Sequence, residues 1–143
     1  MLRGFTTVSY YADDLDAAEA WYTRFLGTEP YYRVPGGYLE FRIGDYQHEL
    51  GIIHSAYATQ DVEGGPAGQI IFWAVDDLDA TLDRLQALGA TLHAAPRDHG
   101  GSGYITASVI DPFGNILGVM ANPHYQAILA NIKAGTHFAE SNT

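Results

Sequence analysis

The sequence predicts an α+β fold in which two copies of a β-α-β-β-β unit follow each other. The main observation is an internal repeat, because residues 13–17 (Asp-Asp-Leu-Asp-Ala) recur as residues 76–80. A strand-like run rich in β-branched and aromatic residues precedes each copy, at residues 5–11 and 69–75. Each copy also opens a segment with apolar residues at helical spacing, and each such segment ends in Leu-Gly.

Both repeated segments have the features of a helix start. Their aspartates supply an N-cap and place negative charge in the first turn, where the helix dipole favours it. One apolar stripe follows in each helix, formed by Leu15, Ala18, Tyr22 and Phe25 in the first and by Leu78, Leu82, Leu85 and Leu88 in the second. Gly27 and Gly89 are suited to end these helices.

Three more strands are expected after each helix. They are predicted near residues 31–34, 38–43 and 47–54 in the first unit and near 91–94, 104–110 and 115–121 in the second. The Gly-rich stretch 97–103 is predicted to be a mobile loop, and residues 110–115 (Ile-Asp-Pro-Phe-Gly-Asn) are interpreted as a turn. We therefore expect one domain over 1–143, with module one at about 3–55, a linker at 56–68, module two at about 69–122, and a C-terminal helix and tail at 123–143.

The C-terminal segment shows one more amphipathic pattern. Tyr125, Ile128, Leu129 and Ile132 keep helical spacing, so we expect a short helix, with a frayed tail after Gly135. Its apolar stripe must be covered, either by the same subunit or by a partner in a homodimer. The sequence leaves both arrangements open.

Composition limits the function classes. With 17 acidic and 7 basic residues the formal charge is −10, which disfavours binding to nucleic acids or to anionic membranes. No run is long enough to span a membrane, and neither disulfides nor thiol catalysis are expected because the chain has no cysteine. The N-terminal residues lack the apolar core of a signal peptide, so a cytoplasmic location is expected.

Further motifs carry a resemblance to a known family. Residues 21–22 (Trp-Tyr) and 25–27 (Phe-Leu-Gly) end the first helical segment, and residues 110–115 precede the last strand. With the two Asp-rich openings, these motifs resemble the vicinal oxygen chelate superfamily, which includes glyoxalase I, extradiol dioxygenases, and bleomycin- and fosfomycin-resistance proteins. The likeness covers nearly the whole chain. It implies the glyoxalase/bleomycin-resistance fold, a cupped mixed sheet with helices on its outer face and the functional site inside the cup.

The resemblance also implies where a metal would be bound. The family's metal enzymes place one ligand on each of four strands, usually two histidines and two glutamates. These positions fall on Thr7, Glu49, Ile70 and Gly118, so only Glu49 has a ligating side chain of the family's kind. Because zinc, nickel and iron sites need three or four donors, we expect no metal cofactor there. Among the six histidines only His99, in the Gly-rich loop, is placed to reach over the cup.

Alternation along the strands indicates which side chains line the cup. They are Thr7, Ser9, Tyr11, Glu49, Ile70, Phe72, Gly118 and Met120. This wall is mostly apolar, and Glu49 is its main ionisable group. Three roles stay open for Glu49: a general base, a partner for a cationic ligand, or a member of a structural polar network.

Two functional hypotheses follow. The first is a small-molecule-binding protein of the bleomycin-resistance kind, a homodimer that sequesters an aromatic or cationic compound without a metal. The alternative is an enzyme, such as a lyase, an isomerase or a dioxygenase-like protein, that uses Glu49 as a base or holds a metal at an unrecognised site. A sensory or partner-binding module without turnover cannot be separated from the first hypothesis by sequence.

Overall fold

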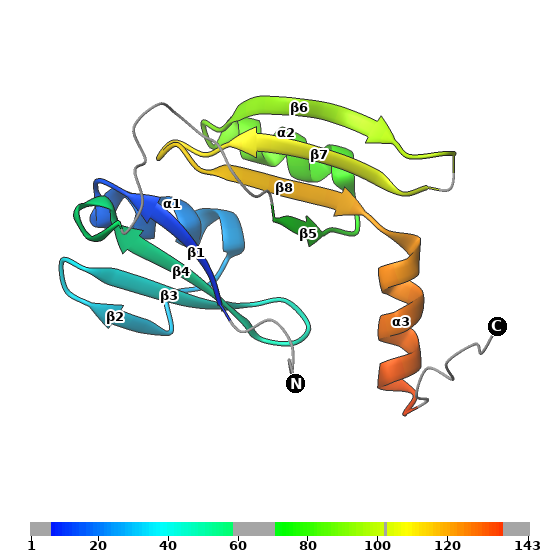
Figure 1. Cartoon of the computed structure of the whole chain (residues 1–143), viewed down its shortest axis with the longest axis horizontal. Coiled ribbons are helices and arrows are strands. Elements are labelled where there is room, and N and C mark those ends of the chain that lie inside the picture. Colours follow the sequence, from blue (N-terminus) through cyan, green and yellow to red (C-terminus); the bar gives the residue numbers. More distant parts are fainter. Residues whose placement is uncertain (1–6, 59–70, 102, 136–143) are drawn as a thin grey trace.

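The protein consists of two similar modules, each with a four-stranded mixed sheet and one long helix (Figure 1). A computed structural model describes residues 7–58, 71–101 and 103–135. Module one contains β1 (Thr7–Ala12), α1 (Leu15–Leu26), β2 (Tyr32–Val34), β3 (Tyr38–Ile43), β4 (His48–His54) and the short 3-10 helix η1 (Ser55–Tyr57). Module two contains β5 (Phe72–Ala74), α2 (Leu78–Ala87), β6 (Thr91–Asp98), β7 (Ile105–Ile110) and β8 (Ile116–Ala121), and α3 (Pro123–Lys133) follows it. The predicted tandem β-α-β-β-β organisation is confirmed.

The two sheets have the same topology. Their strand orders are β1-β4-β3-β2 and β5-β8-β7-β6, so the opening strand of each module lies beside its fourth strand. That pair is parallel in both sheets, and the other neighbours are antiparallel. The pairing places Thr7 opposite Glu49 in the first sheet and Phe72 opposite Gly118 in the second. The described residues thus form two four-stranded mixed sheets, one from each module, as the expected tandem fold requires.

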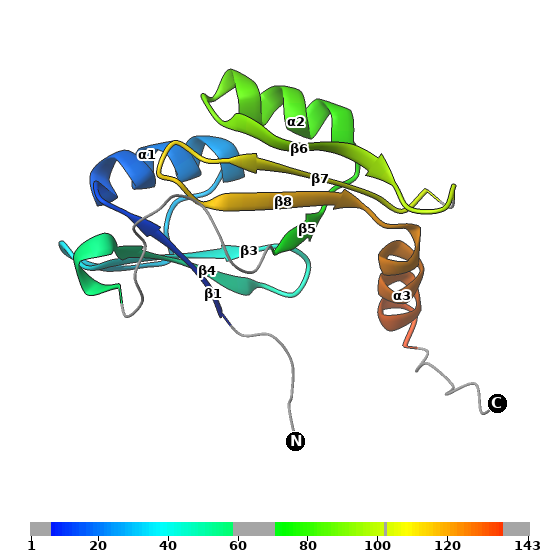
Figure 2. The same ribbon diagram turned by 45° about the horizontal axis from the view of Figure 1, so that its top comes forward.

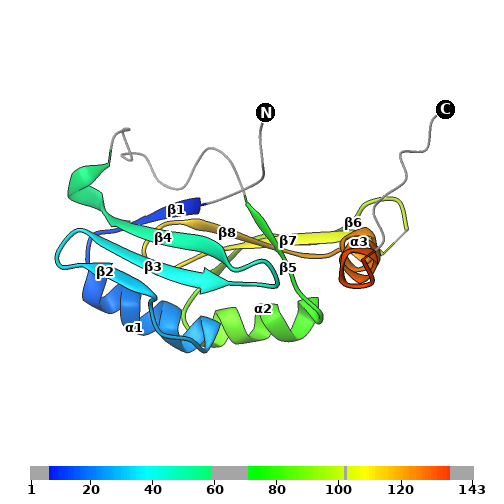
Figure 3. The same cartoon turned by 90° about the horizontal axis from the view of Figure 1, so that it is seen from below.

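The repeated aspartates are helix caps. The Asp14 side chain accepts a hydrogen bond from the Ala17 amide at 2.9 Å, and Asp77 accepts one from the Ala80 amide at 2.9 Å. Gly27, at φ 72°, ends α1 in the left-handed conformation that glycine adopts without strain. Both helices cover the same side of the molecule, which leaves the other face of each sheet as its inner face (Figures 2 and 3).

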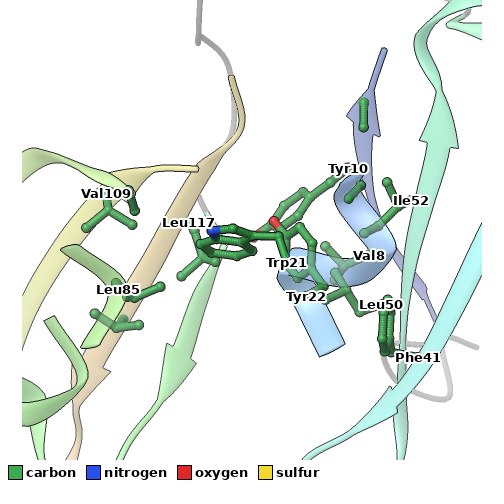
Figure 4. Packing of buried hydrophobic residues seen from close by; sticks show 14 of the residues in the cluster. Val8, Tyr10, Trp21, Tyr22, Phe41, Leu50, Ile52, Leu85, Val109 and Leu117 are labelled. Atoms are coloured by element: carbon green, nitrogen blue, oxygen red, sulfur yellow. The ribbon is translucent and has the colours of Figure 1, made fainter. Parts of the chain in front are cut away.

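The buried residues between helices and sheets form one cluster that continues across both modules (Figure 4). Trp21 on α1 lies at the centre of this cluster, only 3 % exposed, and its Nε1 donates a hydrogen bond to the Leu88 carbonyl at 2.8 Å. Leu88 ends α2, so this bond fixes the two helices to each other. Arg84 of α2 adds a second link by donating to the carbonyl oxygen of Arg24 at 2.5 Å.

A second joint between the modules forms around the carboxylate of Asp111, which is 3 % exposed. It accepts hydrogen bonds from the Tyr22 hydroxyl at 2.5 Å, the Phe113 amide at 2.9 Å, and the amide and side chain of Asn115 at 2.8 Å each. The Asn115 side chain also accepts a hydrogen bond from the Tyr11 amide and donates one to the Tyr11 carbonyl oxygen on β1. Burial raises the pKa of Asp111 above its usual value. The segment interpreted as a turn is therefore also the link between modules.

The prediction for residues 97–103 was wrong in part. Strand β6 does not end at residue 94 but continues to Asp98, because Arg97 and Asp98 pair with Thr106 and Ile105 on β7. The pairing shifts register twice between Leu92 and Arg97, where Pro96 cannot donate a ladder hydrogen bond. The loop was predicted because this proline and the glycines that follow it are the only local signals in the sequence.

Helix α3 follows the end of β8 (Figure 1), and its side chains form hydrogen bonds with both modules of its own chain. The Tyr125 hydroxyl donates to Asp45 in the β3–β4 turn at 3.2 Å, and Gln126 donates to Asp76 before α2 at 3.3 Å. Of the predicted apolar stripe, Leu129 is buried while Ile132 stays 51 % exposed. The same-subunit contact is thus present for part of the stripe.

The remaining expectations concern parts of the chain that the structure covers incompletely. Residues 59–70 of the linker and the start of module two, and the tail from 136, lie outside the described residues. None of the described helices is long and apolar enough to cross a membrane.

The Asp111 joint leads to a stability prediction. We expect Asp111→Ala to lower the free energy of unfolding by about 3 kcal/mol, because it removes four hydrogen bonds and leaves the buried Tyr22 hydroxyl without its partner. Chemical denaturation measures this loss. The matched control is Asp98→Ala, which removes an exposed carboxylate that accepts one backbone hydrogen bond, and should change stability little. Equal losses in both variants would contradict the importance of the joint.

Candidate functional site

The inner faces of the two sheets carry most of the residues expected to line a site. On β1, Val8, Tyr10 and Ala12 are buried toward α1, while Thr7 and Ser9 are exposed on the opposite face. On β4, Leu50 and Ile52 are core residues, so Glu49 has the parity of the inner face. The strand parity expected for these residues is confirmed. Ile70 lies outside the described residues.

Glu49 is fixed from both neighbouring strands. Thr7 lies directly opposite it on β1, and the Thr7 hydroxyl donates a hydrogen bond to its Oε2. Arg42 lies opposite it on β3, and the Arg42 Nη2 is 2.8 Å from its Oε1. The side chain is 19 % exposed, so it can be reached from the inner face. The partners of the Glu49 carboxylate are thus polar and come from its own sheet.

A second carboxylate, that of Glu40 on β3, joins the same group. The Arg42 Nη2 is 3.4 Å from Glu40 Oε1, and the Tyr38 hydroxyl donates to Glu40 Oε2 at 3.0 Å. Burial and the neighbouring Glu40 raise the pKa of Tyr38 to about 12, so its hydroxyl remains a donor at neutral pH. Thr7, Tyr38, Glu40, Arg42 and Glu49 thus form one connected group, which we call the Glu49 cluster.

Each sheet places a glycine beneath an aromatic ring. Gly51 lies opposite Ser9 and Gly118 opposite Phe72, and each of these partners precedes the first aspartate of its repeat by the same distance in sequence. A Cβ at Gly51 would be 2.6 Å from the Tyr38 hydroxyl oxygen, and one at Gly118 would be 2.7 Å from the Phe72 ring. In each sheet a neighbouring ring therefore fills the space above a glycine of the fourth strand.

The inner face of the second sheet is less polar. Phe72 is 37 % exposed, and Met120 is half-buried opposite Thr106. Where β8 passes into α3 lies an open cleft of about 450 Å³, lined by His99, Tyr104, Asn122, Pro123 and His124. The His99 Nε2 is 2.8 Å from the Thr106 Oγ1, so His99 lies against β7 rather than over the Glu49 cluster.

Comparison with known proteins identifies the family. Residues 4–119 match the sequence model described as Glyoxalase/Bleomycin resistance protein/Dioxygenase superfamily. The chain belongs to this superfamily. Comparison of the sequence with curated proteins finds no match.

Solved structures of the superfamily share the fold. A lactoylglutathione lyase from Agrobacterium tumefaciens is 26 % identical with a TM-score of 0.65, over 85 % of this chain and 95 % of that one. A bleomycin resistance determinant encoded on the transposon Tn5 is 21 % identical with a TM-score of 0.61, over 84 % and 98 %. The fosfomycin resistance protein FosX from Mesorhizobium loti is 15 % identical with a TM-score of 0.64, over 90 % and 99 %. These neighbours include both enzymes and resistance proteins.

The residues at the superfamily's metal positions do not fit a metal. Thr7 uses its hydroxyl to donate to Glu49, and Glu49 is paired with Arg42. At Gly118 a side chain would collide with the Phe72 ring and with the Ile71 carbonyl oxygen, each 2.7 Å from its Cβ. Over the described ranges no three His, Cys, Asp or Glu side chains gather into a group that could hold a metal ion.

Sequence reasoning missed Glu40 and Arg42. Both lie on the strand predicted at residues 38–43, and they share the parity of Tyr38, so the signal available was a run of alternating polar residues. Their role depends on the pairing of β3 with β4, which sets Arg42 opposite Glu49. The structure brings together Thr7 with Glu49 and Phe72 with Gly118, while the ligand-binding role of these residues remains a prediction.

The ring over Gly118 can be tested through stability. We expect Gly118→Ala to lower the free energy of unfolding by about 1–3 kcal/mol, because the new methyl group must displace the Phe72 ring and crowds the Ile71 carbonyl oxygen. Thermal or chemical denaturation measures the change. Gly37→Ala is the control, since its Cβ would meet only ordinary contacts beginning at 3.6 Å. A Gly118→Ala variant as stable as the wild type would show that the ring does not occupy this space.

Proposed function

We propose that the protein binds a small aromatic or cationic molecule on the inner face beside Glu49, without a metal at the superfamily's position. One observation carries this proposal: the carboxylate that remains of the family's ligand set is built into the Glu49 cluster rather than into a set of metal donors. Gly118, which falls on another of the family's ligand positions, lies under the Phe72 ring. The surface that remains offers negative charge and rings, which suit a cation or a flat molecule.

Charge supports a cationic group in the ligand. The Glu49 cluster contains two carboxylates and one guanidinium, so its formal charge is negative. The whole chain is also strongly acidic, which favours the approach of cations at long range. Two exposed rings are available for stacking: Tyr31 is 71 % exposed and lies beside Arg42, and Phe72 is 37 % exposed and borders Gly118 on the other sheet.

Substituting Glu49 tests this proposal. We expect a ligand screen containing benzamidine, benzyl alcohol and benzoate to find the aromatic cation as the best binder, and Glu49→Gln to weaken its binding about tenfold or more. Isothermal titration calorimetry measures the affinities. Glu29→Gln is the matched control, because Glu29 also pairs with an arginine but is 74 % exposed on the outer surface.

Two results would overturn the proposal. One is a screen in which only anionic, metal-chelating compounds bind. The other is purified protein that carries stoichiometric nickel, zinc, iron or manganese, measured by elemental analysis.

The second candidate function is enzymatic. Glu49 lies on an accessible inner face, where it could take a proton from a bound substrate in a lyase, isomerase or dioxygenase-like reaction. The structural neighbour that is a lactoylglutathione lyase favours keeping this candidate. It differs from the binding proposal in requiring turnover: any activity found must fall strongly in Glu49→Gln, and an unchanged rate would exclude Glu49 as the base.

We further propose that the protein is a cytoplasmic homodimer. All eight residues of the edge strand β6 are exposed, and Ile132 on α3 is uncovered. Both features supply surface for a second copy. Light scattering coupled to size-exclusion chromatography should give twice the mass of one chain, and a mass of one chain at micromolar concentration would contradict the dimer.

A further inference from the structure

We propose that Arg42 determines the specificity of the Glu49 site: it is an internal cation that holds the place of a ligand's cationic group and is displaced when such a ligand binds. The ligand class is then a compound with an amidinium, guanidinium or primary ammonium group. This inference rests on the proposed function, and it adds both the chemistry of the group recognised and the residue that competes with it.

The carboxylate oxygens of Glu49 and Glu40 are arranged around one atom of Arg42. In both glutamates Oε2 is held by a neutral donor, the Thr7 hydroxyl for Glu49 and the Tyr38 hydroxyl for Glu40. Both Oε1 atoms are then directed at the same atom, Arg42 Nη2, at 2.8 and 3.4 Å. One cationic nitrogen thus forms an ion pair with both carboxylates, and the nitrogens of amidinium and ammonium groups can supply the same positive charge.

Arg42 has further contacts that would hold it in the site after its Nη2 has moved away from the two carboxylates. Its Nη1 donates to the Gln47 carbonyl at 3.3 Å, and its guanidinium carbon lies 5.1 Å from the centre of the Tyr31 ring. Neither contact uses Nη2. The side chain is 34 % exposed, so the guanidinium can turn toward Tyr31 and solvent while the core stays closed.

The negative charge around Nη2 distinguishes the proposed role of Arg42 from that of an anion-binding arginine. An arginine that recognises an anion needs hydrogens directed at the ligand, but Nη2 of Arg42 faces two carboxylates. An anionic ligand would therefore meet net negative charge, whereas a cation that replaces Nη2 restores the balance. Binding of the cation is weakened by the fraction of molecules in which Arg42 occupies the position.

The test compares benzamidine, benzoate and benzyl alcohol on the full chain by isothermal titration calorimetry. We expect Arg42→Gln to bind benzamidine about tenfold more tightly than the wild type, because the internal competitor is removed and two carboxylates remain. Benzoate should not gain affinity. Arg42→Lys, which keeps a cation in reach of both carboxylates, should behave like the wild type.

A matched control lies on the other side of the sheet. Arg33 also bridges two glutamates, Glu19 at 2.8 Å and Glu29 at 3.1 Å, but it does so against the outer helix α1. Arg33→Gln should leave all three affinities unchanged. A change equal to that of Arg42→Gln would show that only the overall charge of the protein matters, and would overturn the inference.

A measurement on the wild-type chain keeps the test independent of the variants' stability. Side-chain NMR signals of Arg42 should shift on addition of benzamidine, since its Nη2 loses both carboxylates, while those of Arg33 should stay in place. Unchanged Arg42 signals at saturating benzamidine would overturn the inference.

The outcomes distinguish the inference from the proposed function. If benzamidine binding depends on Glu49 but Arg42→Gln leaves it unchanged or weakens it, the function stands and the displacement of Arg42 is wrong. If Arg42→Gln abolishes binding of benzoate, Arg42 is an anion-binding residue and the ligand class is wrong. If benzamidine binds neither the wild type nor Arg42→Gln, both proposals are wrong.

Discussion

The relative position of the two modules depends on hydrogen bonds that converge on one buried carboxylate. Asp111 in module two is linked to Tyr22 on α1 and, through Asn115, to the backbone of Tyr11 on β1. A charge without partners is costly in the protein interior, so separating the modules would leave these groups either unpaired or newly hydrated. This joint and the Trp21 hydrogen bond to the end of α2 together set how the inner faces of the two sheets are oriented relative to each other.

Most of the fold could be predicted because its signals are local. The repeated aspartates, the apolar stripes and the glycines that end helices act within a few residues, and each has its expected place in the structure. The extent of β6 could not be predicted, since it depends on pairing of Arg97 and Asp98 with β7 across an irregular stretch. Likewise, the turn at residues 110–115 could be recognised, but its bonds to module one come from residues far away in sequence.

The candidate site was predictable only where counting along strands was enough. Thr7 and Glu49 could be placed on one face, and the missing donors at the other metal positions could be read from the residue types. The partners of Glu49 could not be predicted. Arg42 lies opposite Glu49 because of the register in which β3 pairs with β4, and the sequence alone does not reveal that register. An apolar environment was expected from the second sheet, whereas neighbours within the first sheet supply the nearest charges.

The aromatic ring over Gly118 limits which side chains this strand can carry. Because the Phe72 ring and the Ile71 carbonyl oxygen fill the space that a Cβ would need, a glutamate introduced at Gly118 would crowd the strand before it could serve as a ligand. Engineering a metal site on this face would therefore need a change at Phe72 together with the one at Gly118, so the design problem involves a pair of positions and not one residue.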